Sequence, residues 1–283
     1  MKTWCALALA LLLALPAAAE TADPLAAYAL TDGQTVEVDL DGDGEAETLS
    51  YRVVPDIETG EGIGVEISVA DGGASATWGS DMIFRPDAYI ADLDGDGATE
   101  VLVSGDWASA DFVTWGLRWD GHAFQRLSFA SDSRSGAGVG YTDEGYGHVF
   151  AIGDGRVTLI GAYDALGTYS ATRVYALRDG VFEFADDGLW HVQVAGYAWD
   201  IPLVTTREVS ATFVEDGAEV EGTLPVGARL IITASDGTSV AWFETEDGRE
   251  GYLSIAPDAQ RGWGSTVDGV PEDDVFKMVP YAG

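Results

Sequence analysis

Cysteine is nearly absent from this chain of 283 residues. Cys5 is the only one, and it lies inside an N-terminal apolar segment. If that segment is removed, no thiol remains, which excludes disulfide bonds and thiol chemistry in the rest of the chain. An exported form would therefore depend on a buried core, on bound metal, or on both.

Positive charge is scarce as well. Lysine and arginine number 14 against 48 aspartates and glutamates, so the formal net charge is −34. Such a field repels phosphate backbones and anionic headgroups, and we therefore expect no nucleic-acid partner and no attraction to anionic membranes. A polyanionic surface instead favours solubility and divalent cations.

Long apolar runs occur only at the N-terminus. Lys2 precedes an apolar run over residues 4–15, and Pro16 and three alanines then lead to Glu20. This pattern is typical of a secretory signal peptide, and we assign residues 1–19 to it. A retained anchor would need about 20 apolar residues. We expect a secreted, extracellular or cell-wall-associated protein without membrane insertion after cleavage.

Sustained helical periodicity is missing after residue 30. Short alternating apolar runs such as residues 65–69, 101–103 and 230–233 are broken by Gly and Asp, which predicts an all-β fold. Asp-Gly pairs between such runs favour type I′ turns, since both residues tolerate positive φ. The predicted hairpin tips are Asp71-Gly72, Asp120-Gly121, Asp179-Gly180 and Asp247-Gly248.

A unit of about two hairpins is repeated three times within residues 36–186. The first copy contains an acidic loop at residues 39–47 (loop 1), and the second contains a similar loop at residues 92–100 (loop 2). The loop of the third copy has shortened to Gly153-Asp154-Gly155. Residues 128–147, between the second and third copies, are rich in Ser, Gly and Asp, which predicts a long surface loop that contacts a ligand or is mobile, with a disordered insertion as the alternative.

The composition changes after about residue 200, where four or five short strands with tight turns are predicted. We therefore expect two domains, at residues 20–200 and 201–283. Residues 241–253 combine a tryptophan strand, an Asp-Gly turn and a Gly-Tyr-Leu strand, and residues 224–230 precede them with Pro and Gly. These features resemble bacterial SH3-like domains. The resemblance implies a small SH3-like β-barrel that attaches exported proteins to cell-wall components.

Loops 1 and 2 share the six residues Asp-Leu-Asp-Gly-Asp-Gly and end in a glutamate. Carboxylates this dense repel one another unless a cation compensates them, and calcium takes about 6 to 8 such oxygen ligands. The glycine after the third Asp permits the sharp turn that brings both ends of the loop together. The expected calcium ligands are the side chains of Asp39, Asp41, Asp43 and Glu47 with the carbonyl of Glu45, and of Asp92, Asp94, Asp96 and Glu100 with the carbonyl of Ala98.

An EF-hand uses the same early positions but needs a bidentate Glu at position 12. Position 12 is Ser50 in the first case and Val103 in the second, and the flanks are β-like, so neither an EF-hand nor a dockerin fits. The loops instead resemble the FG-GAP/VCBS-like repeat family, with Glu in place of the last Asp. That resemblance implies calcium-binding β-propeller blades. Three copies are fewer than the roughly four to eight blades of a propeller, so a β-propeller-like domain and an irregular β-meander both remain open.

Known catalytic motifs are missing from the sequence: it contains no HExxH, GxSxG or CxxC, and its three histidines stand apart. We therefore expect a non-enzymatic binding or adhesion-type protein in which calcium is mainly structural. Its partner would be a cell-wall peptide or glycan, or another extracellular protein. A third possibility is a structural domain pair whose only ligand is metal.

The alternative function is an extracellular carbohydrate-active enzyme or carbohydrate-binding module with a cleft of carboxylates and aromatic rings. Aromatic side chains at alternating strand positions would either form this sugar platform or pack in the core. The candidates are Trp107, Trp115, Trp119, Tyr163, Tyr169, Trp190, Tyr197 and Trp199.

Overall fold

The computed structural model describes residues 28–55, 58, 62–71, 74–81, 83–106, 112–132, 139–193 and 202–281. The expected signal peptide at residues 1–19 lies outside this part. The all-β prediction is confirmed, because the described chain forms strands throughout and has one short helix, α1 (Glu272–Val275). None of the described helices has the length and apolar character needed to span a membrane.

The first copy folds into a separate four-stranded antiparallel sheet in the order β2-β3-β4-β5. Its strands are β2 (Thr35–Val38), β3 (Glu47–Pro55), β4 (Gly62–Asp71) and β5 (Ala74–Asp81). Alternate residues of β3 point into the core, with Leu49 and Tyr51 buried, as the period of a half-buried strand requires.

The second copy forms an antiparallel meander from β6 to β9, and the short strand β1 pairs with its β6 edge. The strands are β1 (Ala29–Leu30), β6 (Phe84–Ala91), β7 (Glu100–Asp106), β8 (Phe112–Trp119) and β9 (Phe124–Asp132). Strand β7 is buried on both faces, because it lies between neighbouring sheets rather than at the surface.

The third copy repeats the antiparallel meander, and β15 pairs in parallel with β9 of the second copy. Its strands are β12 (His148–Gly153), β13 (Arg156–Asp164), β14 (Thr168–Arg178) and β15 (Val181–Phe184). The turn between β14 and β15 is the predicted Asp179-Gly180 tip, and both residues have positive φ. The predicted tips at residues 120–121 and 247–248 also lie in hairpin turns, whereas the tip near Gly72 lies partly outside the described residues.

The prediction of a long surface loop at residues 128–147 is wrong for the part of this range that the structure describes; residues 133–138 lie outside that part. Strand β9 continues to Asp132 and pairs with β10 (Val139–Thr142), and β11 (Gly145–Tyr146) pairs with β8. Phe129 is buried and drives this part of β9 into the core, a contribution that the Ser- and Gly-rich composition concealed.

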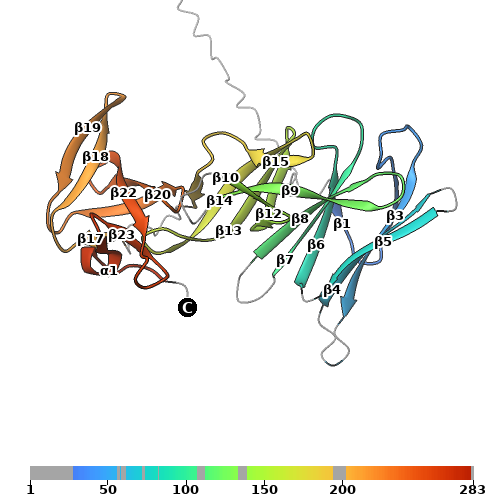
Figure 1. Cartoon of the computed structure of the whole chain (residues 1–283), viewed down its shortest axis with the longest axis horizontal. Coiled ribbons are helices and arrows are strands. Elements are labelled where there is room, and N and C mark those ends of the chain that lie inside the picture. Colours follow the sequence, from blue (N-terminus) through green and yellow to red (C-terminus); the bar gives the residue numbers. More distant parts are fainter. Residues whose placement is uncertain are drawn as a thin grey trace, which may run out of the picture.

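The C-terminal part contains the remaining strands, which are short and joined mainly as antiparallel hairpins. Apart from β16 (Trp190–Val192), which pairs with β14 of the third copy, they are β17 (Leu203–Thr205), β18 (Val209–Glu215), β19 (Ala218–Leu224), β20 (Arg229–Ser235), β21 (Val240–Thr245), β22 (Glu250–Pro257), β23 (Ser265–Val267), β24 (Val270–Pro271) and β25 (Phe276–Lys277). Figure 1 shows these strands at one end of an elongated chain and the sheet β2–β5 at the other. No closed barrel occurs in the described residues. Two architectures were open for the repeat region, a β-propeller-like domain and an irregular β-meander, and the structure has the form of the irregular meander.

Three hydrophobic cores follow one another along the molecule. The first joins the sheets of copies one and two around Leu49 and Trp119, and the second joins copies two and three around Phe129 and Phe182. The third lies in the C-terminal part around Phe213, Phe243 and neighbouring residues. Each copy therefore gains its core from its neighbours, as stacked repeats generally do.

The turn between β13 and β14 joins the repeat region to the C-terminal part. Leu166 at its tip has a positive φ of 55° and is 0% exposed, because its side chain packs in the C-terminal core. The backbone N–H of Thr168 donates to the carbonyl of Pro280 at 2.6 Å. Strand β16 also pairs with β20 through Trp190 and Ser235. The boundary expected near residue 200 is thus crossed by two separate sets of contacts.

Candidate metal-binding loops

Loops 1 and 2 occupy equivalent turns of the first two copies. Loop 1 connects β2 to β3 and loop 2 connects β6 to β7, as the sequence predicts for hairpin loops. The register places Val38 opposite Glu47 and Ala91 opposite Glu100. Each closing glutamate is therefore the first residue of the return strand, where its position is fixed by the sheet.

The first aspartate of each loop accepts two backbone N–H groups. In loop 1, the N–H groups of Gly42 and Gly44 donate to the two carboxylate oxygens of Asp39 at 2.7 and 2.9 Å. The corresponding distances from Gly95 and Gly97 to Asp92 are 2.7 and 3.2 Å. All four glycines have positive φ, which explains why glycine is needed at these places.

The second and third aspartates are oriented in the same manner. Asp41 accepts the N–H of Asp43 at 3.2 Å, and Asp43 accepts the N–H of Glu45 at 2.7 Å. The equivalent bonds of loop 2 run from Asp96 to Asp94 at 3.4 Å and from Ala98 to Asp96 at 2.9 Å. One oxygen of every member of the two trios lies within 4.8 Å of those of its partners, so the backbone holds two preformed groups of three carboxylates.

The closing glutamates make a different contact. Glu47 is 3% exposed and accepts the N–H of Leu40 at 2.7 Å, while Glu100 is 0% exposed and accepts the N–H of Leu93 at 2.9 Å. Burial raises the pKa of both carboxyls above the usual value, although these hydrogen bonds oppose the shift. Neither glutamate belongs to the convergent groups, so its role as a ligand stays a prediction, as do the carbonyls of Glu45 and Ala98.

Arg118 distinguishes loop 2 from loop 1, and sequence reasoning missed it. Its guanidinium pairs with Asp94 at 2.7 Å and Asp96 at 3.5 Å, and it contacts Glu100 most closely. Burial alone would raise the pKa of Asp94, but the hydrogen bond and charge of Arg118 lower it on balance. The carboxylates of loop 2 are therefore partly neutralised by the protein itself.

No equivalent cation reaches loop 1 from the residues that the structure describes. The strand register explains the difference. Leu117 lies opposite Val101 and is followed by Arg118, whereas Ala70 lies opposite Thr48 and is followed by Asp71. The position that supplies a positive charge to loop 2 holds an aspartate in the first copy.

The corresponding turns of the three copies lie side by side. A Cβ added to Gly42 would lie 3.2 Å from the nitrogen of Ala98, so loop 1 contacts loop 2. A Cβ added to Gly155 would lie 3.1 Å from the carbonyl oxygen of Leu93, so loop 2 contacts the β12–β13 turn. Negative charge is consequently concentrated along one row of turns.

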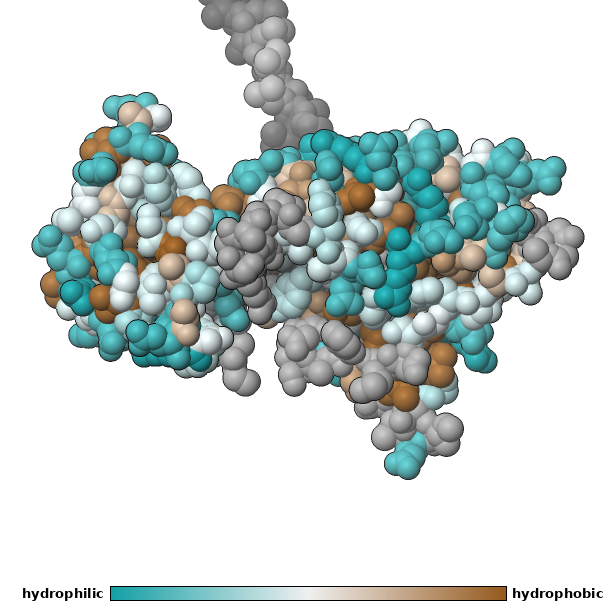
Figure 2. Space-filling view, viewed as in Figure 1, coloured by the Kyte–Doolittle hydropathy of each residue, from teal (hydrophilic) through white to brown (hydrophobic). Residues whose placement is uncertain are grey.

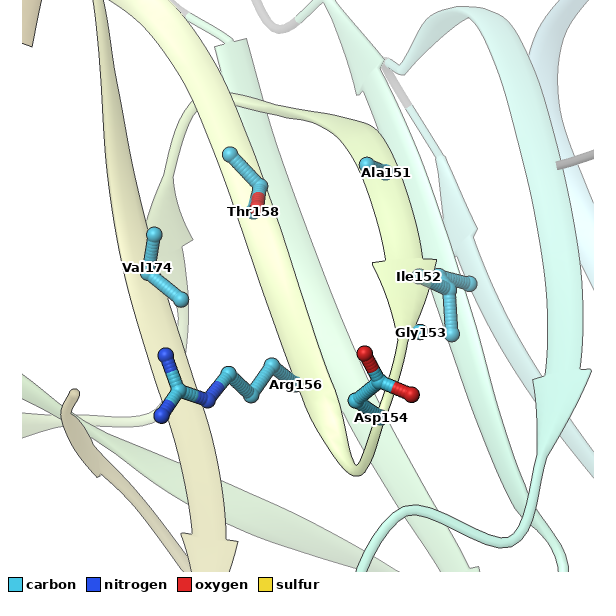
Figure 3. Close-up of a pocket in the computed structure, with 7 residues that line it drawn as sticks. All are labelled: Ala151, Ile152, Gly153, Asp154, Arg156, Thr158 and Val174. Carbon is cyan, nitrogen blue, oxygen red and sulfur yellow. The ribbon is translucent and has the colours of Figure 1, made fainter. Parts of the chain in front are cut away.

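The turn of the third copy has no acidic trio. It borders an open depression of about 550 Å³ on strands β12 to β14, in which Asp154 and Arg156 are the charged residues (Figure 3). Arg156 pairs with Asp186 at 2.7 Å, and both side chains are about half exposed. This shallow and already paired site offers one carboxylate where the other copies offer three.

The aromatic residues considered for a sugar platform pack in the core wherever the structure describes them. Trp115, Trp119 and Trp190 are buried, and Tyr163 and Tyr169 pack partly buried against the C-terminal core, so the core interpretation holds for these five. Trp107, Tyr197 and Trp199 lie outside the described residues. Figure 2 shows mainly hydrophilic residues over the visible face of the repeat region, with hydrophobic ones in scattered groups.

In the described part of the chain, no histidine belongs to a cluster of three or more metal-ligating side chains, and the two aspartate trios are the only such clusters there. His122 is exposed at the β8–β9 turn, and His191 lies 3.1 Å from Asp187. His148 packs against the ring of Phe112 with centroids 4.2 Å apart, and burial lowers its pKa.

Comparison with known proteins adds no identity to this geometry. No family model, curated protein or solved structure matches the chain.

Proposed function

We propose that this chain is an exported, calcium-binding protein that acts by binding a partner rather than by catalysis, and that calcium mainly stabilises its β-hairpins. The observation that supports the calcium role is the pair of convergent aspartate trios with the same backbone hydrogen bonds. Carboxylate oxygens in this number are the ligands that calcium prefers.

Loop 1 is the stronger of the two proposed sites. Its trio has no arginine or lysine partner among the described residues, so a divalent cation would relieve an uncompensated repulsion there. In loop 2 an incoming cation has to displace Arg118 from Asp94 and Asp96. We therefore expect calcium to occupy loop 1 at lower concentration than loop 2.

Calcium would act on stability through the hairpins. Each loop joins two paired strands whose side chains enter the core shared by copies one and two. A cation that binds only the folded loop stabilises the whole unit by mass action. With millimolar calcium and a dissociation constant of about 10⁻⁴ M, the gain is on the order of 1 kcal/mol per site.

Calorimetric melting in calcium and in chelator, at matched ionic strength, tests the proposal. Calcium should raise the melting midpoint, and Asp41→Asn with Asp43→Asn should remove most of the increase, because each of these carboxylates accepts one backbone N–H and asparagine keeps one acceptor oxygen but not the charge. Asp216→Asn, in the exposed β18–β19 turn, is the matched control. An unchanged midpoint in the unmodified protein would sink the calcium role.

A further inference from the structure

A second candidate site lies where the β13–β14 turn meets the C-terminal part. It is a pocket of about 390 Å³, within the roughly 300–1,000 Å³ that is typical of small-molecule sites. Its principal lining residues are Asp164, Leu166, Trp263, Glu272 and Tyr281. We call it the junction pocket, because the repeat region supplies the first two and the C-terminal part supplies the other three.

Two exposed aromatic rings form walls of the junction pocket. Trp263 is 55% exposed and Tyr281 is 45% exposed, whereas the tryptophans Trp115, Trp119 and Trp190 are buried. The two rings meet at an interplanar angle of 84° with centroids 5.5 Å apart. An aromatic pair at right angles presents both a ring face and a ring edge to a ligand, and ring faces attract cations.

The acidic groups of the pocket lack a positive partner. Asp164 accepts the hydroxyl of Thr168 at 2.6 Å, and Glu272 accepts the N–H of Ser265 at 2.9 Å and the hydroxyl of Tyr281 at 2.8 Å. In the described chain, no arginine or lysine pairs with either carboxylate. The pocket is therefore negative, and nothing on the described chain neutralises its two lining acids.

Arg261 shows that this aromatic surface accommodates a cation. Its guanidinium pairs with Asp273 at 2.7 Å and lies 5.5 Å from the ring centroid of Trp263. Asp273 also accepts the hydroxyl of Tyr281 at 2.5 Å, so the one phenol proton is shared between this carboxylate and Glu272. Arg261 thus compensates Asp273 and leaves the pair Asp164 and Glu272 to a ligand.

We propose that the junction pocket binds an ammonium group carried on an aliphatic stem, such as a peptide lysine or a free alkyl amine. The ammonium would lie between Asp164 and Glu272, with a ring face of Trp263 or Tyr281 beside it. The stem would lie along the other of these two rings, since Trp263 and Tyr281 are the exposed apolar residues of the lining. Charge selects this ligand class, since a protein of net charge −34 repels anions.

The inference goes beyond the proposed calcium role and does not depend on it. Strand β13 begins beside loop 2, because the β12–β13 turn contacts Leu93, and it ends at Asp164 in the pocket. A strand of this length spans about 27 Å, so the two sites are separated by most of the repeat sheet. Amine binding measured in calcium and again in chelator separates the two proposals.

The experiment uses the full chain and titration calorimetry with Nα-acetyl-lysine N-methylamide and with cadaverine. The neutral control ligand is the lysine amide acetylated on its side-chain nitrogen. We expect saturable binding of an amine that the neutral ligand does not reproduce. The preferred amine identifies the source: tighter binding of the lysine amide indicates a peptide, and tighter binding of cadaverine indicates a free amine.

Two variants test the location. Trp263→Ala and Asp164→Asn should each weaken binding by about three- to thirtyfold, the range that a cation–π contact or one charge supports. Phe150→Ala, which removes an aromatic residue that is also exposed, and Asp216→Asn are the matched controls and should bind as the unmodified chain does. Melting midpoints verify that all four variants fold. The Trp263 side chain is exposed, so its truncation to alanine leaves no cavity in a core.

The proposal is overturned if no amine binds saturably, if the neutral ligand binds as well as the amine, or if both pocket variants retain full affinity. Binding of sugars in place of amines would also overturn it and would favour the carbohydrate alternative. Loss of the calcium effect with intact amine binding would reject only the calcium role.

Discussion

At the scale of single residues, Arg118 has the clearest measurable role. Its guanidinium contacts three carboxylates of loop 2, one of which, Glu100, is fully buried. Arg118→Gln should lower the free energy of unfolding in chelator by about 1–3 kcal/mol, because a buried carboxylate loses its charged partner. Urea unfolding in chelator and in calcium measures this loss.

The same variant should gain more stability from calcium than the unmodified chain, because the loop 2 trio no longer has a competing cation. Arg156→Gln is the control, since its pair with Asp186 is exposed and surface pairs contribute little. An equal calcium gain in Arg118→Gln and the unmodified protein would show that Arg118 does not compete with metal.

Glu272 gives a second residue-scale prediction, on pH dependence. Burial raises its pKa, with the charges of Asp273 and Asp164 acting in the same direction, against the hydrogen bonds from Tyr281 and Ser265. The folded protein therefore holds this proton more tightly than the unfolded chain. The stability that the group contributes is present below its ordinary value of 4.5 and is lost as pH rises through the higher folded pKa.

Gln in the variant Glu272→Gln resembles the protonated carboxyl, so the variant should not lose stability as pH rises. We expect the variant to be more stable than the unmodified chain at about pH 7, with the difference shrinking as pH falls toward 4.5. Urea unfolding at several pH values provides the comparison. A difference that is constant across this range would contradict a role for Glu272 titration.

At the scale of structural elements, the tip of the β13–β14 turn is buried in a hydrophobic core, which is unusual for a loop. Leu166 adopts a positive φ that is costly for a branched side chain, and it is 0% exposed in the C-terminal core. Leu166→Ala keeps the backbone requirement but leaves a cavity, which should cost about 2–5 kcal/mol of unfolding free energy. Val226→Ala, at an exposed position, should be close to neutral in the same denaturant titration.

The elements also show what the sequence could predict. The hairpins around loops 1 and 2 and the Asp-Gly turns follow from local chemistry, since alternating apolar residues and positive-φ turn residues determine them within a few positions. The β9–β10 hairpin was missed because one buried residue, Phe129, outweighs a polar composition. The insertion of Leu166 into another core is a long-range contact that no local pattern reports.

The candidate sites divide in the same way. The aspartate trios were predictable because the members of each trio lie within one loop, and the structure brings the three members of each trio together as expected. Arg118 was not predictable, because it reaches loop 2 from strand β8, through a register that only the folded sheet defines. Trp263 carried a signal that was overlooked, since a tryptophan between two glycines, Gly262 and Gly264, does not suit a strand interior.

At the scale of the whole molecule, the two parts of the chain are tied together at three places. Leu166 enters the C-terminal core, Thr168 bonds to Pro280, and β16 pairs with β20. Separating the parts would expose the first contact and break the others. We therefore expect the protein to unfold in a single cooperative transition, with equal calorimetric and van't Hoff enthalpies.

Gly237 offers a way to break this coupling with a single methyl group. It lies in the β20–β21 turn, and a Cβ there would collide with the hydroxyl of Tyr163 from the repeat region. Tyr163 cannot yield readily, because its ring stacks on Trp190 with centroids 5.0 Å apart. Gly237→Ala should therefore push the parts from each other and split the calorimetric transition into two.

Gly217→Ala separates this effect from backbone strain. Gly217 has a φ of +78° against +73° at Gly237, but a Cβ at Gly217 meets nothing within 4 Å. Both variants pay a similar conformational cost, and only Gly237→Ala disturbs the junction. If both variants show one transition with the same shift, the contact between Gly237 and Tyr163 does not couple the repeat region to the C-terminal part. If the unmodified protein already shows two transitions, the two parts unfold independently.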